Sequence, residues 1–154
     1  MIRGSGDERA SAHLVYSGGP SDPRTAGTGV PAAGLPALRS GYPAAPGAGD
    51  VEALTALAEP DAVVWHNHAE SEGGVDQANR TVAWLHRTVP DLTWEDVAVR
   101  STVDGFVWRA ILTGTAPGGP LRAHTCVVAT VSDRGLVARL DEYLDPAAVA
   151  VLSG

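Results

Sequence analysis

The sequence has a single cysteine, no excess of basic charge and no long apolar run. Of its 154 residues, 18 are acidic and 11 are lysine or arginine, which gives a formal charge of -7. An acidic chain without a cluster of basic residues repels the phosphate backbone, so we expect no nucleic-acid partner. Cys126 alone cannot form a disulfide within the chain, which fits a reducing cytoplasm.

No segment approaches the ~20 consecutive apolar residues that a membrane helix needs, so we expect no membrane partner. Residues 1–8 also lack the apolar run of a secretory signal. The hydrophobic fraction of 44% is ordinary for a globular protein. These observations together predict a cytoplasmic globular protein.

Glycine and proline are concentrated before Asp50, where ten of the 18 glycines and six of the 11 prolines lie. Glycine costs backbone entropy and proline removes a hydrogen-bond donor, so regular elements are disfavoured there. The apolar residues of this stretch show neither a helical nor a strand period. We therefore expect residues 1–49 to be irregular or disordered and residues 50–154 to form one domain.

Regular patterns begin at Asp50, a good N-cap. Helices are predicted over residues 51–58, 76–89 and 147–152, and strands over residues 62–67, 92–99, 106–115, 121–131 and 136–144. The alternation of apolar residues slips at Glu95–Asp96, which predicts a β-bulge. Because turns join the last four strands directly, we expect an α+β fold with an antiparallel sheet and helices on one side.

Four segments resemble the nuclear transport factor 2-like superfamily, and within it the SnoaL-like group. They are residues 49–54 (GDVEAL), 61–67 (DAVVWHN), 107–115 (VWRAILTGT) and 139–146 (RLDEYLDP). The resemblance implies a cone-shaped, curved antiparallel sheet (an α+β barrel) whose concave side is covered by helices and encloses an apolar pocket. The first helix of the family corresponds to the glycine-rich stretch and is missing or atypical here.

The resemblance also implies a homodimer. Phe106, Trp108, Ala110 and Leu112 alternate away from Arg109, so one face of this strand is apolar. An uncovered apolar face of that size would mark an interface between two copies.

Glu142 is the first candidate for chemistry, because it shares a strand face with Leu140 and Leu144. Apolar surroundings disfavour the charged form of a carboxyl group and suit it to proton transfer. In the resembling family an acidic residue at this place is often catalytic. We predict Glu142 as the acid/base and the two leucines as pocket wall; the alternative is an exposed carboxylate at the sheet rim.

Arg109 shares its strand face with Val107 and Ile111, which we predict as pocket residues. A buried guanidinium needs a partner, so Arg109 would pair with Glu142 or face water. In resembling epoxide hydrolases an aspartate follows this arginine two residues later, and Ile111 holds that place here. Epoxide hydrolysis is therefore a weaker alternative.

Trp65 and Asn67 share a face of the first strand. In the same epoxide hydrolases an aromatic residue and an asparagine hold the nucleophilic water. We predict Asn67 as a ligand of a substrate oxygen and Trp65 as pocket wall. The alternative for Asn67 is a residue that caps a turn.

His124 could face Glu142 as a second acid–base group if its strand face is inward; a surface histidine is the alternative. The His66-x-His68 pair followed by Glu72 has the ligand spacing of a cupin metal site. The flanking glycines of that motif are missing, so no metal site is expected.

The sequence predicts a cofactor-independent enzyme that isomerises, cyclises or dehydrates a small hydrophobic carbonyl compound. Glu142 would transfer the proton, and Arg109, Asn67 and His124 would orient or polarise the substrate oxygen. One alternative is a non-catalytic ligand-binding or dimerisation module, since a fold does not fix a function. A further alternative is an epoxide hydrolase or a metal-dependent enzyme that uses His66 and His68.

Overall fold

A computed structural model describes residues 41–42 and 44–154; the expectations for residues 1–40 and 43 lie outside this part of the chain. The helical elements are α2 (Ala44–Ala48), α3 (Val51–Ala56), α4 (Val75–Thr88), α5 (Pro146–Val149) and the short 3-10 helix η1 (Ala150–Ser153). The strands are β1 (Ala58–His66), β2 (Ser71–Gly74), β3 (Thr93–Ser101), β4 (Gly105–Ala116), β5 (Gly119–Val131) and β6 (Val137–Leu144).

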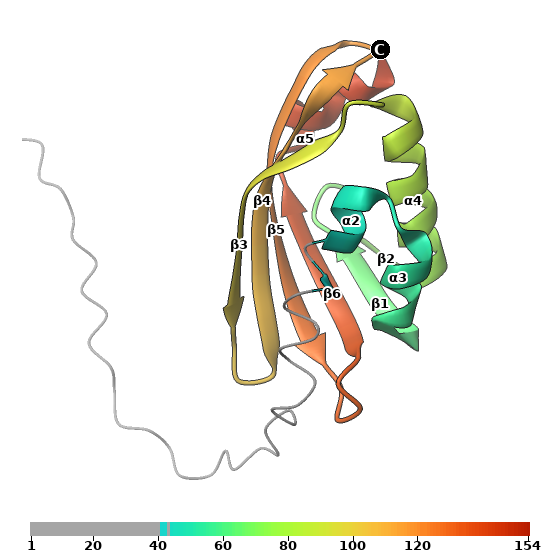
Figure 1. Ribbon diagram of the computed structural model, residues 1–154, viewed down its shortest axis with the longest axis vertical. Coiled ribbons are helices and arrows are strands. Elements are labelled where there is room, and N and C mark those ends of the chain that lie inside the picture. Colours follow the sequence, from blue (N-terminus) through green and yellow to red (C-terminus); the bar gives the residue numbers. More distant parts are fainter. Residues whose placement is uncertain (1–40, 43) are drawn as a thin grey trace, which may run out of the picture.

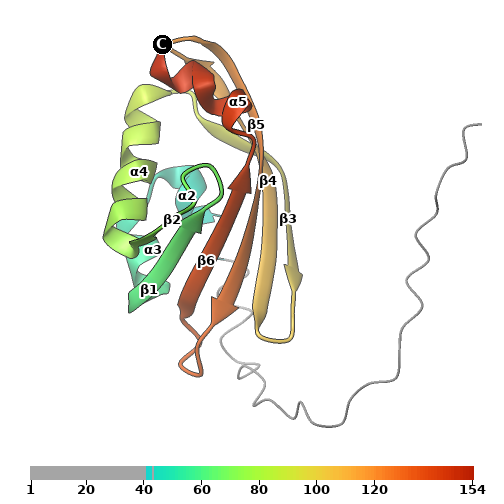
Figure 2. The same ribbon diagram turned by 180° about the vertical axis from the view of Figure 1, so that it is seen from behind.

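The strands form one six-stranded sheet in the order β2-β1-β6-β5-β4-β3. It curves without closing, and α2, α3 and α4 lie on its concave side (Figures 1 and 2). Helix α5 lies across one end of the sheet, near the C-terminus (Figure 2). The predicted α+β architecture, with a curved sheet and helices on the concave side, is confirmed.

The pairing of β1 with β6 brings together the first and the last strand of the described part of the chain. This pair is parallel, whereas the other neighbours in the sheet run antiparallel. Its register places His66 of β1 opposite Glu142 of β6. On the other side of β6, Glu142 is opposite Val127 of β5. Glu142 is thus near the centre of the sheet, next to two neighbouring strands.

The inner face of β4 is the one that carries Phe106 and Trp108, which are 0% and 1% exposed. Ala110 and Leu112 follow them on that face and are buried as well. This corrects the expectation that the face of Arg109 points inward. The corrected phase agrees with β5, where Leu121, Ala123, Thr125, Val127 and Ala129 are buried in alternation.

Helix α2 lies within the stretch expected to be irregular, so for Ala44–Ala48 that expectation is wrong. Tyr42 and Ala45 are buried, and Tyr42 packs on the core residues Phe106 and Trp108. The packed structure therefore begins before the expected boundary at Asp50.

The expected β-bulge in β3 is confirmed. The register between β3 and β4 shifts between Glu95 and Ala98, and Asp96 takes a φ angle of 49°. A left-handed backbone is uncommon outside glycine but is best tolerated by Asp and Asn, which suits this position.

Helix α4 spans 14 residues and has its N-cap at Gly74. It begins at Val75, one residue before the predicted start at residue 76. His86 and Arg87 in its last turn are favourable at the negative end of the helix dipole. Among the described residues, no helix is long and apolar enough to cross a membrane.

Candidate active site

A cavity of about 330 Å³ lies between the inner face of the sheet and the helices. Most of its wall is apolar, and the polar side chains are few, which is the usual composition of a small-molecule site. The buried or half-buried polar side chains of the wall include Glu142, His66, Thr125, Asn79 and the phenol of Tyr42. Apolar wall residues include Leu54, Leu57, Val64, Val82, Leu85, Trp94, Trp108, Leu112, Val127, Leu140 and Leu144.

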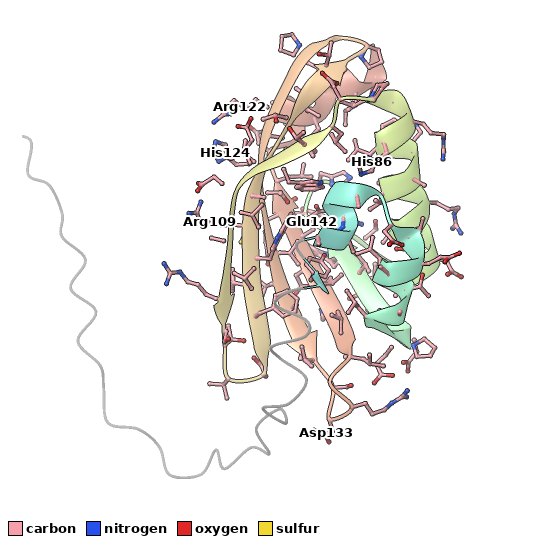
Figure 3. The ribbon with its side chains drawn as sticks, in the orientation of Figure 1. His86, Arg109, Arg122, His124, Asp133 and Glu142 are labelled. Carbon is pink, nitrogen blue, oxygen red and sulfur yellow. The ribbon has the colours of Figure 1, made fainter. Side chains whose placement is uncertain are left out.

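Glu142 and His66 form a hydrogen-bonded pair in this wall. The Nδ1 atom of His66 lies 2.8 Å from Oε2 of Glu142, and Thr125 donates its hydroxyl to Oε1 at 3.3 Å. The two paired side chains are 24% and 20% exposed respectively, which leaves them open to a ligand but shielded from bulk water. Figure 3 shows Glu142 on the inner side of the sheet. The carboxylate is therefore oriented by two neighbours from adjacent strands.

The hydrogen bond to Glu142 raises the pKa of His66, and the negative charge of Glu142 adds to this, while burial acts in the opposite direction. His68 lies beside His66 at the exposed end of β1, with the two rings 5.4 Å apart. Because its pKa is raised, His66 keeps its proton to a higher pH than an ordinary histidine, next to the carboxylate.

Tyr42 adds a neutral phenol to the same cavity wall. Burial, and then the negative charge of Glu142, raise the pKa of this phenol. Its ring packs against Phe106 at 5.4 Å and Trp108 at 5.8 Å. Tyr42 therefore stays protonated at any pH at which the protein would work.

Arg109 and His124 do not lie in the cavity, so their predicted position is corrected. Both project from the outer side of the sheet (Figure 3). Arg109 is 54% exposed and donates to Asp96 at 2.7 Å, and His124 is exposed between Arg122 and Cys126. The physical reason is the phase of β4 and β5, whose apolar sides face the core.

Val107, Ile111 and Trp65 were predicted as pocket residues and are likewise absent from the cavity wall. Val107 and Ile111 share the outer face of β4 with Arg109. Trp65 contacts the exposed Tyr143, with the ring centroids 5.4 Å apart. Leu140 and Leu144 do line the cavity, as predicted.

Asn67 has a structural partner instead of a place in the cavity wall. Its Nδ2 donates to the carbonyl oxygen of Leu144 at 2.9 Å, and its Oδ1 accepts from the Leu144 amide at 3.0 Å. These two bonds extend the parallel pairing of β1 and β6 by one residue. They use both ends of the amide, so the expected contact with a substrate oxygen is corrected.

The cupin-like spacing does not assemble a ligand set. Glu72 pairs with Arg139 at 2.8 Å on the outer side of the sheet, away from His66 and His68. In the part of the chain that the structure describes, no three His, Cys, Asp or Glu side chains gather around one point.

Sequence reasoning missed His66 as the partner of Glu142, and also missed Tyr42 and Thr125. The sequence did indicate that His66 faces inward, because it alternates with the apolar residues Ala62 and Val64. These three residues share the inner face of β1 and line the cavity.

The comparison with protein families agrees with the geometry. A family model described as the SnoaL-like domain matches residues 40–140, more than half of the chain. The chain belongs to the SnoaL-like family. The predicted resemblance is thereby confirmed. The search of curated proteins found no match.

Solved structures with the same fold include SnoaL-like and ketosteroid isomerase-like proteins. Wild-type IdmH from Streptomyces antibioticus, described as a candidate polyketide cyclase, is 20% identical with a TM-score of 0.65, over 78% of this chain and 99% of that one. A protein with a ketosteroid isomerase-like fold from Catenulispora acidiphila is 15% identical with a TM-score of 0.64, over 78% and 94%. PrhC from Penicillium brasilianum is 17% identical with a TM-score of 0.65, over 78% and 85%. At these identities the SnoaL-like chain shares the fold with them.

Proposed function

We propose that this SnoaL-like protein is a cofactor-independent enzyme that moves a proton on a small, mostly apolar carbonyl compound. The observation that carries the proposal is the Glu142–His66 pair in the wall of an apolar cavity. A positioned carboxylate and an imidazole are common groups in general acid–base catalysis, and groups with a shifted pKa, such as His66, cluster at functional sites.

In the proposed reaction, Glu142 takes a proton from the carbon next to the substrate carbonyl. The electron pair of the broken C–H bond moves into the carbonyl and gives an enolate. The neutral phenol of Tyr42 is a candidate to stabilise the enolate oxygen. If a carbon–carbon double bond is conjugated with the enolate, Glu142 returns the proton to the far carbon of that system, which isomerises the compound. Alternatively, the enolate carbon attacks a second carbonyl group of the same compound, whose oxygen takes the proton from Glu142, and this cyclises the compound.

His66 supports both steps through its hydrogen bond to Oε2 of Glu142. When His66 is protonated, its charge stabilises the ionised carboxylate; when it is neutral, its Nδ1 proton still orients it. Thr125 fixes the second oxygen from the neighbouring strand. The carboxylate would therefore keep one orientation while the substrate reacts.

The cavity volume limits the substrate. A space of about 330 Å³ holds a compound of roughly 10–15 non-hydrogen atoms when it is filled to a density near that of protein interiors. One ring or two fused rings fit that limit. The polyketide cyclase name of a structural neighbour supports a carbonyl compound as the class.

The test is exchange of the hydrogens next to a ketone for deuterium, followed by NMR in deuterated water. This assay detects proton removal whatever the final product is. We would use 1-tetralone and 2-tetralone, which are two-ring ketones within the size limit. The parent protein should accelerate exchange of at least one, and Glu142→Gln should reduce the acceleration about 100-fold.

Thr81→Val is the matched control, because Thr81 lines the same cavity and bonds within α4 rather than to Glu142. It should exchange at the parent rate. Equal rates for the parent and Glu142→Gln would remove Glu142 from the chemistry. Binding of a tetralone without any exchange would favour the alternative of a non-catalytic ligand-binding module.

A further inference from the structure

Asn79 is the buried polar side chain that α4 contributes to the cavity wall, and the proposed chemistry does not use it. It is 8% exposed, and the other cavity residues of this stretch of α4 are the apolar Val75, Ala78 and Val82 and the exposed Gln77 and Thr81. A polar amide in such a wall costs free energy unless its groups find partners. The hydrogen bonds that Asn79 already makes therefore show which of its donor and acceptor groups remain for a ligand.

The hydrogen bonds of Thr55, on α3, determine which end of the Asn79 amide points toward Thr55. The Thr55 hydroxyl lies 2.8 Å from the carbonyl oxygen of Val51, which can only accept, so the single hydroxyl proton is used there. Thr55 Oγ1 is then an acceptor for its second contact, at 2.7 Å, and that contact is the Nδ2 of Asn79. The NH₂ group points to Thr55, and the carbonyl oxygen Oδ1 points elsewhere.

The Oδ1 atom of Asn79 accepts no hydrogen bond from the described residues. Within these residues, the fully enclosed side-chain polar atoms without a partner are the indole nitrogens of Trp94 and Trp108. Oδ1 is not one of them, and the residue itself is in the cavity wall. An acceptor of this kind in an apolar wall is complementary to a donor on a ligand.

We propose that Asn79 is a specificity residue whose amide oxygen accepts a hydrogen bond from a hydroxyl group of the substrate. The substrate class is then a small hydroxylated ketone, with its carbonyl end at Glu142 and its hydroxyl at α4. A hydroxyl suits the site because Asn79 presents an oriented acceptor. The placement of the substrate's carbonyl group at Glu142 rests on the proposed function. The placement of its hydroxyl group at Asn79 concerns ligand recognition alone.

The experiment compares the binding of 1-tetralone with that of its 5-, 6- and 7-hydroxy derivatives by isothermal titration calorimetry. These isomers place the same donor at different distances from the carbonyl group. At least one isomer should bind the parent protein about 3- to 10-fold more tightly than 1-tetralone, the usual value of one neutral hydrogen bond. Asn79→Leu should bring this ratio close to one, because the apolar side chain cannot accept.

Thr55→Val is the second variant, since it leaves Asn79 and the cavity volume unchanged. Thr55 is exposed, and valine has nearly the same shape, so the fold should survive. Without the Thr55 acceptor the amide can turn and present its NH₂ group, which should reduce the preference. Thr81→Val, which alters the same cavity wall without touching Asn79, should keep the parent ratio.

The inference is overturned if no isomer binds better than 1-tetralone, or if the preference persists in Asn79→Leu. A structural tie between α3 and α4 would change stability in these variants without changing the binding ratio. The outcome is also separate from the proposed chemistry. If the hydroxyl preference is found and no ketone hydrogen exchanges, the enzymatic proposal fails while the role of Asn79 stands.

Discussion

The hydrogen bond between Glu142 and His66 can be tested without a substrate, by changing Glu142 to Gln. The amide is nearly isosteric, so the cavity keeps its shape while the negative charge disappears. The main cause of the raised pKa of His66, its hydrogen bond to a charged carboxylate, is then reduced at most to a neutral hydrogen bond, and burial, which lowers this pKa, remains. The pKa of His66 should therefore fall in the variant. NMR titration of the histidine ring protons measures it directly.

The size of the effect on stability follows from the geometry. A hydrogen bond to a charged group contributes about 1.5–3 kcal/mol when shielded, and exposed ion pairs contribute less than about 1 kcal/mol. With 20% and 24% exposure, the pair lies between these cases. We expect Glu142→Gln to lower the free energy of unfolding by about 1–2 kcal/mol at about pH 5.5, measured by urea denaturation.

The pH dependence has a definite sign. The pKa of His66 is higher in the folded state than its ordinary value of 6.5, so the stabilisation is fully present below that value. It is lost as the pH rises through the folded-state pKa. The difference between parent and variant should therefore be larger at about pH 5.5 than at about pH 9.

Glu72→Gln provides the control, because Glu72 pairs with Arg139 outside the cavity. It should leave the His66 titration unchanged. If His66 titrates identically in the parent and in Glu142→Gln, the pair is not formed in solution. The geometric basis of the proposed acid–base site would then be wrong.

Three further outcomes are expected. Removing residues 1–46 should cost about 3–5 kcal/mol in urea unfolding, because it deletes the buried Tyr42. Arg109→Ala should change stability by less than about 1 kcal/mol and tetralone affinity not at all, since its ion pair with Asp96 is exposed. The expected homodimer stays a prediction: light scattering should give twice the chain mass, and Tyr143→Glu, on the outer sheet face, should weaken the dimer; a monomer at micromolar concentration would count against it.

The order of elements was largely predictable, because hairpins are specified by local signals. The turns at residues 104–105, 117–120 and 132–135 separate strands that alternate clearly, and all three hairpins are present. Strand β2 was not predictable, since Ser71–Gly74 has no apolar alternation of its own. It exists because β1 is available to pair with it.

The face of β4 was predictable in principle, although the expectation was wrong. One face carries Phe106, Trp108, Ala110 and Leu112, and the other carries Arg109 between two apolar residues. Burying a guanidinium without a partner costs far more than exposing a valine, so burial alone should have chosen the first face. The same comparison gives the correct inner face for β6, the face of Leu140 and Glu142, because the alternative face carries Arg139 and Asp141.

The Glu142–His66 pair could not be deduced from local patterns, because its partners are 76 residues apart and meet through the parallel β1–β6 pairing. A shift of that register by one residue would turn the whole strand face over. Trp65 would then take the place of His66 in the cavity. The two hydrogen bonds of Asn67 to Leu144 hold the end of this register. Asn67, predicted to contact substrate, thus bears on the site by keeping His66 opposite Glu142.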